Sequence, residues 1–257
     1  MDKSKKESTK RVPTGIPGFD ELIEGGVPRN SSTLVCGGPG TGKSIFCLQY
    51  LINGATKFNE NGLYITFEQR REALVEQAKQ FGWDLDSLEK TGKLKIISIP
   101  VEKITKKTIK EIQDNVKKGD VKRLVIDSLS TLVINAPIYT TPNELAVQDV
   151  VGENIVFSPP IIGDYIVKRF VYDFIEKLRE MNSTNLLISE ASQNGEYITR
   201  DTLSEFVCDG IVLLKLEPLG GEYSRTLAVM KMRATKNNGD IHPLEINQKG
   251  LDVHKVD

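Results

Sequence analysis

A glycine-rich segment, GGPGTGKS at residues 37–44, limits the fold of this chain more than any other feature of its sequence. It matches the pattern G-x-x-x-x-G-K-[ST] and lies between an apolar run at 31–36 and a helical apolar stripe that begins at Lys43. Glycines let consecutive backbone N–H groups approach an anion without a Cβ in the way, and the helix dipole adds to the attraction. Strand, loop and helix in this order predict a phosphate-binding loop.

We expect this loop to hold the phosphates of ATP together with Mg²⁺. Lys43 would supply a mobile positive charge for the β- and γ-phosphates, and the Ser44 hydroxyl is placed to ligate the metal. The apolar strand at 123–126 ends in Asp127, which predicts a second magnesium contact, made through water. The residues expected to contact the nucleotide are Gly38, Pro39, Gly40, Thr41, Gly42, Lys43, Ser44 and Ile45.

Alternating strand and helix patterns predict an α/β fold with a doubly wound, mostly parallel sheet. Strands are expected at 31–36, 63–67, 94–99, 123–126 and 185–189, and helices at 17–24, 43–54, 71–81, 106–117 and 164–181. Two later strands, at 211–216 and 225–233, predict an antiparallel hairpin at the sheet edge. Residues 1–12 are polar and lysine-rich, so we expect a flexible tail there and a single domain over 13–257.

Residues 135–163 interrupt this alternation. The segment contains four prolines and has no clean period, so we expect a long loop or insertion between a strand and a helix. Loops of this length are uncommon in compact domains and are either functional or disordered. The sequence leaves two interpretations open, an element that binds a partner and a flexible insertion.

Composition and charge argue against several classes of site. With 34 basic and 35 acidic residues the net charge is -1, which gives no bulk attraction to nucleic acid or to an anionic membrane. Cys36, Cys47 and Cys208 lie in apolar runs and are expected to be reduced core thiols. His242 and His254 have no partners at metal-ligand spacing. No apolar stretch approaches the roughly 20 residues of a membrane span, and we expect a cytoplasmic protein.

Three charged residues have two interpretations each. Glu68 follows the apolar strand LYITF, and the carboxyl ends of parallel strands line the ligand crevice. Glu68 could therefore orient or deprotonate an attacking water, or be a solvated residue at the start of the next helix. Lys231 and Arg233 are two apart on an expected strand and share a face. From spacing alone, they indicate a solvated basic edge more than a pair of catalytic cations.

Taken together, these motifs resemble the KaiC family of RecA-type ATPases, and most closely its single-domain archaeal and bacterial members. The resemblance covers nearly the whole chain. It rests on the entry segment and loop at 13–44, ITFEQ at 65–69, LVIDSLS at 124–130, VCDGIVLLKLE at 207–217 and LAVMKMRAT at 227–235. With the last two segments counted together as the C-terminal strands, these are four motifs in the family's order, which are far more specific than any one of them.

The resemblance implies a RecA-like fold and assembly into a ring, usually a hexamer, with ATP between subunits. It implies that Glu68 is the catalytic glutamate, acting with Lys43. It further implies that Lys231 and Arg233 reach the γ-phosphate of the neighbouring subunit's ATP, as an arginine finger does. Many members carry two adjacent glutamates where this chain has Glu68 and Gln69, so we expect slow turnover. The chain has one ATPase domain, so the phosphorylation cycle of the two-domain clock protein is not implied.

Three functions stay open at this point. The leading hypothesis is a ring-forming, Mg-dependent ATPase that regulates an unidentified protein partner. The second, motivated by Gln69, is an ATP-binding regulatory or scaffold module with little hydrolysis. The third is a RecA- or RadA-like DNA-binding ATPase, motivated by candidate channel loops at 135–163 and 190–205. The near-neutral charge and the acidic, proline-rich first loop disfavour this third hypothesis.

Overall fold

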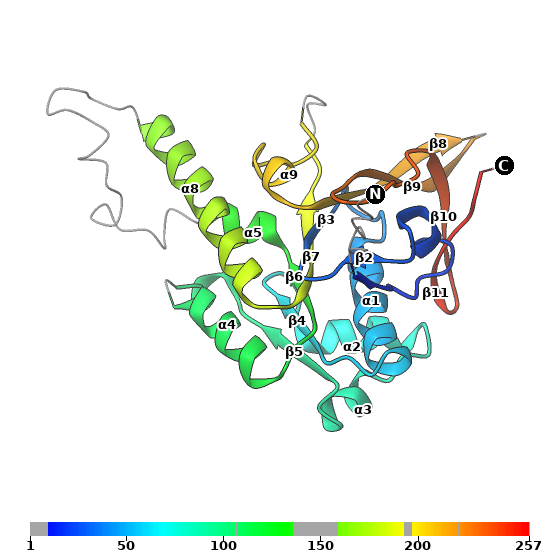
Figure 1. The fold of residues 1–257 in the computed structure, drawn as a ribbon, viewed down its shortest axis with the longest axis horizontal. Coiled ribbons are helices and arrows are strands. Elements are labelled where there is room, and N and C mark those ends of the chain that lie inside the picture. Colours follow the sequence, from blue (N-terminus) through cyan, green and yellow to red (C-terminus); the bar gives the residue numbers. More distant parts are fainter. Residues whose placement is uncertain (1–9, 106, 136–158, 193–196, 220, 257) are drawn as a thin grey trace, which may run out of the picture.

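The computed structural model describes residues 10–105, 107–135, 159–192, 197–219 and 221–256. Within these ranges the centre of the molecule is a nine-stranded sheet in the order β11-β10-β9-β8-β3-β7-β6-β4-β5 (Figure 1). The six strands from β8 to β5 pair in parallel, and β9, β10 and β11 pair antiparallel. The predicted α/β class, with a mostly parallel sheet and antiparallel C-terminal strands, is confirmed.

Strands and helices alternate along most of the chain. The strands of the main sheet are β3 (Ser32–Gly37), β4 (Gly62–Thr66), β5 (Leu94–Ser98), β6 (Arg123–Asp127), β7 (Thr184–Glu190), β8 (Gly210–Leu219), β9 (Glu222–Met232), β10 (Ile241–Asn247) and β11 (Gly250–Val253). The helices are α1 (Lys43–Lys57), α2 (Arg71–Lys79), α3 (Leu85–Lys90), α4 (Thr108–Lys118), α5 (Leu129–Ile134), α8 (Pro159–Glu180) and α9 (Ser204–Val207). None of these described helices combines the length and the apolar composition that a membrane crossing needs.

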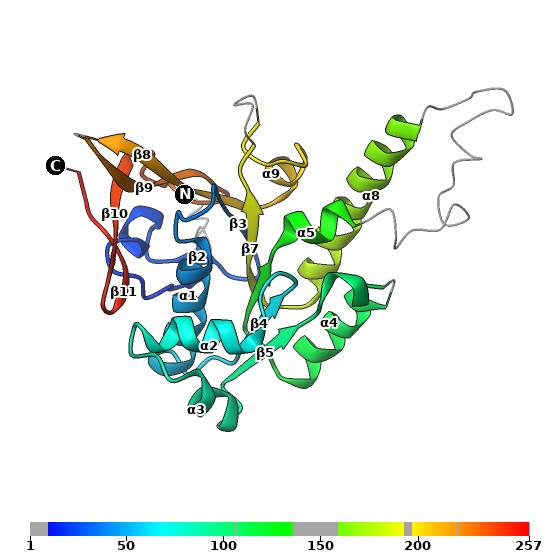
Figure 2. The same cartoon turned by 180° about the vertical axis from the view of Figure 1, so that it is seen from behind.

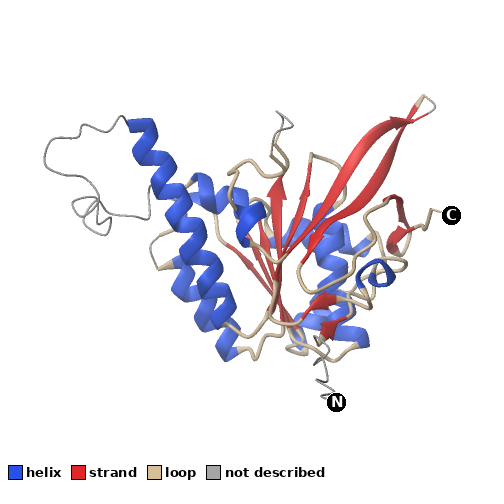
Figure 3. Ribbon diagram, turned by 45° about the horizontal axis from the view of Figure 1, so that its top comes forward, coloured by secondary structure: helices blue, strands red, loops and turns tan. Residues whose placement is uncertain are grey.

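Helices cover both faces of the sheet, as Figures 2 and 3 show. Val35 of β3 packs into the apolar cluster that contains α1, whereas Leu34 and Cys36 pack into the cluster that contains α4, α5 and α8. Phe46 and Phe174 are buried in these two clusters, one in each. Burying a side chain of this kind contributes roughly 1.5–3 kcal/mol. Burial on both faces explains why these strands are continuous apolar runs in the sequence.

The C-terminal part of the sheet is larger than expected. The predicted hairpin is present as β8 and β9, but β10 and β11 extend the sheet beyond it. Along β10, His242 and Leu244 are buried, while their neighbours Ile241, Pro243 and Glu245 are exposed. This alternation is the pattern of a strand with one buried face.

Three short helices, α3, α5 and α9, lie outside the set that the sequence predicts. The helices α3 and α5 have six residues each, and each is capped by a side chain that accepts a backbone N–H bond, Asp84 in α3 and Ser128 in α5. Six residues hold fewer than two turns, so an apolar period is hard to detect in them. The helix expected at 17–24 is instead a single 3-10 turn, Asp20–Ile23.

The N-terminal segment at 1–12 and the loop at 135–163 have boundaries that differ from the predicted ones. Residues 1–9 lie outside the described part of the chain, but Arg11–Val12 form strand β1 and pair with β2, Val27–Pro28. Of the long loop expected at 135–163, residues 136–158 lie outside the described part. Helix α8 begins at Pro159, five residues before its predicted start at 164. Prolines are tolerated in the first turn of a helix, where the missing N–H has no partner to lose.

Candidate functional site

The glycine-rich loop joins the carboxyl end of β3 to the first turn of α1. Gly40 and Gly42 have φ angles of 73° and 102°, a region that favours glycine. A Cβ on Gly37 would lie 2.5 Å from the carbonyl oxygen of Leu214 and 2.7 Å from Thr41 Oγ1. The glycine pattern in the sequence therefore follows from the backbone path of this loop.

Lys43 folds back over the loop in this structure. Its Nζ donates to the carbonyl oxygens of Gly37 and Gly38, at 2.9 and 2.7 Å. Burial lowers the pKa of Lys43, and the nearby carboxylates of Asp127, Glu190 and Glu68 act in the opposite direction. A half-buried ammonium group held by neutral carbonyls is well placed to exchange them for an anionic ligand.

Asp127 lies at the end of β6 and is 2% exposed. Its Oδ2 accepts hydrogen bonds from the Tyr64 hydroxyl at 2.6 Å and from Ser44 Oγ at 3.3 Å. Burial raises the pKa of Asp127 to about 6, against the opposing effect of the Tyr64 bond. A carboxylate beside a serine hydroxyl is a pair of hard oxygen ligands, which fits Mg²⁺.

Glu68 lies beside this cluster because β4 and β6 are parallel neighbours with Thr66 opposite Asp127. The Glu68 residue is exposed, yet its Oε1 accepts from both Ser128 Oγ, at 2.5 Å, and Thr131 Oγ1, at 2.7 Å. The structure thus brings Lys43, Ser44, Glu68 and Asp127 to one edge of the sheet.

Lys231 and Arg233 do not join this cluster. Lys231 is opposite Ile211 of β8, which is itself opposite Leu34, three residues before the end of β3. The Lys231 Nζ donates to three backbone carbonyl oxygens around α9, those of Glu205, Phe206 and Cys208, at 3.0, 3.1 and 2.7 Å.

The Arg233 guanidinium is held in the same region. It donates to Asp209 Oδ1 and to the carbonyl oxygen of Phe206, both at 3.1 Å. The side chain remains 48% exposed. Both cations are therefore at the surface, and neither contacts the glycine-rich loop of its own chain.

Arg225 of β9 is a candidate site residue that our sequence analysis does not include. Its Nε donates to the carbonyl oxygen of Gly40 at 3.0 Å, so it lies directly on the loop. Arg225 is opposite Leu216, and Gly37 is opposite Leu214, so β9 passes the loop at this point. Its one signal in the sequence is a basic residue within the predicted hairpin, at the hairpin end far from Lys231.

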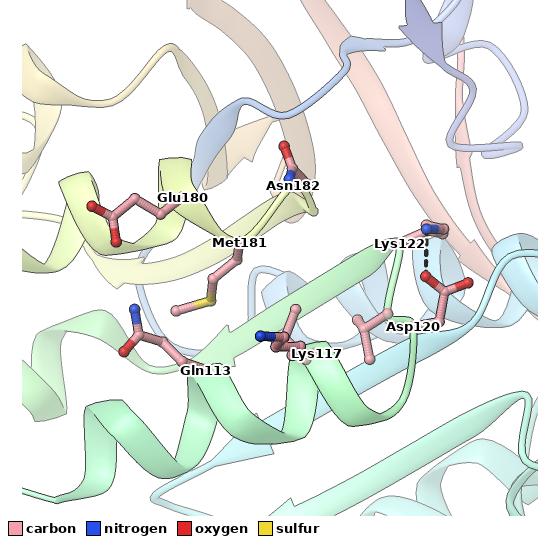
Figure 4. A pocket seen from close by; sticks show the side chains of 9 residues that line it. Gln113, Lys117, Asp120, Lys122, Glu180, Met181 and Asn182 are labelled. Carbon is pink, nitrogen blue, oxygen red and sulfur yellow. Dashed lines mark hydrogen bonds and ion pairs between the residues drawn. The ribbon is translucent and has the colours of Figure 1, made fainter.

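A separate surface pocket of about 460 Å³ lies between the C-terminal ends of α4 and α8 (Figure 4). It is lined by the end of α4, the turn at 120–122 and residues 180–182. Within it, Lys122 Nζ forms an ion pair with Asp120 at 2.6 Å. The pocket is at the amino ends of β6 and β7, opposite the glycine-rich loop, and none of the predicted site residues lines it.

Comparison with known protein families identifies the family to which this chain belongs. A family model described as "ATPase: KaiC" matches residues 12–141 and 161–257. The chain belongs to the KaiC family. The match is interrupted inside the 135–163 segment, where the sequence pattern is irregular. Membership of this family supports ATP binding and ATPase activity.

Individual relatives match the chain over most of its length. UPF0273 proteins of Methanocaldococcus jannaschii and Thermotoga maritima are 33% and 32% identical, and each match covers 95% of this chain and 96% of the relative. The circadian clock oscillator protein KaiC of Prochlorococcus marinus is 31% identical over 98% of this chain but only 47% of its own length. The crystal structure of a KaiC-like protein from Pyrococcus horikoshii superimposes with a TM-score of 0.78, at 31% identity, covering 96% of this chain and 100% of that one.

Proposed function

We propose that this chain is a Mg-dependent ATPase that hydrolyses ATP slowly at the subunit interfaces of a ring, usually a hexamer in this family, and regulates a protein partner. The observation that carries the proposal is the convergence of Lys43, Ser44, Glu68 and Asp127 beside the glycine-rich loop. One cation, one hydroxyl and two carboxylates at the carboxyl edge of a parallel sheet are the groups that phosphoryl transfer from ATP to water needs.

The glycine-rich loop would bind the phosphates. Its backbone N–H groups would donate to the phosphate oxygens, and the helix dipole at the start of α1 favours negative charge there. Lys43 would leave the carbonyl oxygens of Gly37 and Gly38 and bind the β- and γ-phosphates. Ser44 and, through water, Asp127 would hold Mg²⁺, which when bound neutralises charge on the phosphate oxygens.

Glu68 would orient the attacking water and accept its proton. Oxygen Oε1 of Glu68 already accepts two hydroxyl hydrogen bonds, so Oε2 is the oxygen available to the water. As the water oxygen bonds to the γ-phosphorus, the bond to the β-γ bridging oxygen breaks and ADP leaves with that electron pair. The residue next to Glu68 is Gln69, whose neutral amide cannot take the proton, and this supports slow turnover.

Lys231 and Arg233 would act on the ATP of a neighbouring subunit. Two observations support this role: the pair lies away from the Lys43 cluster of its own chain, and an exposed aromatic residue lies beside it. Both cations donate to the carbonyl oxygen of Phe206, whose side chain is 59% exposed, and aromatic residues are enriched at interfaces. A cation supplied across an interface would make hydrolysis depend on ring formation.

Phosphate release by the purified protein tests the proposal. With ATP and Mg²⁺ we expect steady release that chelation of magnesium stops, and that dilution below the assembly range also stops. Binding and assembly without release would instead favour the regulatory or scaffold module.

A further inference from the structure

Three oxygen atoms form a compact group next to the nucleotide edge of the sheet. Glu68 Oε1 is 2.5 Å from Ser128 Oγ and 2.7 Å from Thr131 Oγ1, and the two hydroxyl oxygens are 3.0 Å apart. The carboxylate comes from the end of β4, whereas both hydroxyls come from the start of α5. One oxygen of the candidate base is therefore held by a separate element of the fold.

Counting protons assigns the direction of each bond. An ionised carboxylate only accepts hydrogen bonds, and each hydroxyl has one proton to donate. Ser128 Oγ also accepts the backbone N–H of Thr131 at 3.2 Å, as the cap of α5. Both hydroxyl protons are thus directed at Glu68 Oε1, and the contact between the two hydroxyls carries no proton.

The Thr131 hydroxyl is fixed by its surroundings. Thr131 lies in the first turn of α5, and its neighbour Ser130 anchors that turn to β7 by accepting the N–H of Glu190 at 2.9 Å. Threonine is also stiff at χ1, because two heavy atoms branch from its Cβ. Glu68, in contrast, is exposed, and a long side chain of this kind loses rotamer entropy when it is fixed.

We propose that Thr131 is a positioning residue that, together with Ser128, fixes the Glu68 carboxylate so that Oε2 faces the attacking water. The role of Thr131 rests on the proposed function, because it concerns the base of that same reaction. Thr131 does not contact substrate itself. Its contribution is to orientation, and small errors in the placement of a reacting group are costly in rate.

The test compares Thr131→Val, Thr131→Ser and wild type by steady-state ATP hydrolysis. Valine keeps the branched shape and removes the hydroxyl, and serine keeps the hydroxyl. We expect kcat to fall about tenfold in Thr131→Val with KM for ATP unchanged, and to return to within about twofold of wild type in Thr131→Ser. Thr91→Val, which removes a hydroxyl bond from the distant end of α3, is the matched control and should leave kcat unchanged.

A double-mutant cycle separates positioning from general damage. Adding Thr131→Val to Glu68→Gln should lower the remaining rate no further, because the group that Thr131 orients has already been changed. The inference would be overturned if Thr131→Val lowered kcat by the same factor in wild type and in Glu68→Gln. An unchanged or raised kcat in Thr131→Val alone would also overturn it. If Thr131→Val does not fold, Thr131→Ala is measured in the same cycle.

Crystal structures of wild type and Thr131→Val provide a readout that does not need turnover. We expect Glu68 to bond both hydroxyls in wild type and to occupy more than one rotamer in the variant. A single unchanged Glu68 rotamer in Thr131→Val would overturn the positioning role even if the protein were inactive. Absence of turnover in a wild type whose Glu68 bonds are intact would instead count against the proposed ATPase function.

Discussion

Ser44 at the start of α1 donates a hydrogen bond to Asp127 at the end of β6, with 3.3 Å between Oγ and Oδ2 and 83 residues between them in the sequence. Strand β3, which leads through the loop to Ser44, and strand β6, which ends at Asp127, are not neighbours, since β7 lies between them. The bond therefore passes across the carboxyl end of β7, beside the glycine-rich loop. Tyr64 from β4 binds the same oxygen of Asp127, so two strands and one helix contribute to one point.

The burial of Asp127 predicts a pH-dependent gain in stability for Asp127→Asn. Burial raises the pKa of Asp127 in the folded protein from 3.8 to about 6, so the folded state favours the protonated carboxyl group. The resulting contribution to the free energy of unfolding is fully present below pH 3.8 and is lost as the pH rises through about 6. We expect Asp127→Asn to unfold with a free energy up to about 3 kcal/mol higher than wild type at pH 8, and about half that gain at pH 5.

Urea unfolding of the nucleotide-free protein at the two pH values measures this difference. Asp173→Asn is the control, because Asp173 is exposed on α8 and its removal should make little difference at either pH. A wild type at least as stable as Asp127→Asn at pH 8 would contradict the argument. A carboxylate that destabilises the free protein is expected at a cation site, where function opposes stability.

Lys43→Ala should abolish hydrolysis through loss of binding. The variant loses the charge that pairs with the phosphates, and charge-assisted bonds of this kind contribute roughly 1.5–3 kcal/mol each, so we expect at least about a hundredfold weaker nucleotide binding. Titration with a fluorescent ATP analogue gives the affinity. Lys57→Ala, at the other end of the same helix, should bind as wild type does. Wild-type affinity in Lys43→Ala would show that the loop is not the phosphate site.

Arg233→Ala should bind ATP and assemble but fail to hydrolyse. On the ring model its guanidinium stabilises charge on a neighbouring subunit's γ-phosphate, so we expect kcat to fall at least about a hundredfold. Arg179→Ala is the matched control, since Arg179 donates to the carbonyl oxygen of Val207 in the same region but lies on α8. Unchanged turnover of Arg233→Ala in an assembled ring would refute the role across the interface.

Arg225→Ala should weaken nucleotide binding about tenfold, because it removes a charged group that donates to the backbone of the glycine-rich loop. Lys215→Ala removes a cation from the adjacent strand, where Lys215 pairs with Glu217, and should bind nucleotide normally. Calorimetric titration with ADP measures both variants. If the two bind equally well, Arg225 is a surface residue without a part in the site.

The sequence predicted those parts of the molecule that local patterns encode. The glycine-rich loop and the apolar strand before Asp127 are contiguous motifs, so their places at the carboxyl edge of the sheet could be expected. The places of Tyr64 and Thr131 could not be expected. Tyr64 reaches the site through the pairing of β4 with β6, and Thr131 reaches it through the cap of a six-residue helix. The strand β10 lies outside the predicted set, although His242 and Leu244 follow a period of two.

The contacts of Lys231 and Arg233 also could not be predicted from local sequence patterns. Spacing placed Lys231 and Arg233 on one strand, but only the structure shows that both donate to the carbonyl oxygen of Phe206. That contact depends on α9, a four-residue helix for which the sequence carries no clear signal. Whether the pair reaches another subunit is a property of the assembly and stays a prediction.

One measurement tests the central claim most directly: phosphate release from Mg-ATP by wild type and Glu68→Gln, with the mass of each assembly determined by light scattering on the same samples. We predict turnover in wild type that falls at least about a hundredfold in a Glu68→Gln assembly of the same mass. Equal turnover in the two proteins would contradict the role of Glu68, and binding and assembly without turnover in wild type would contradict the ATPase function itself.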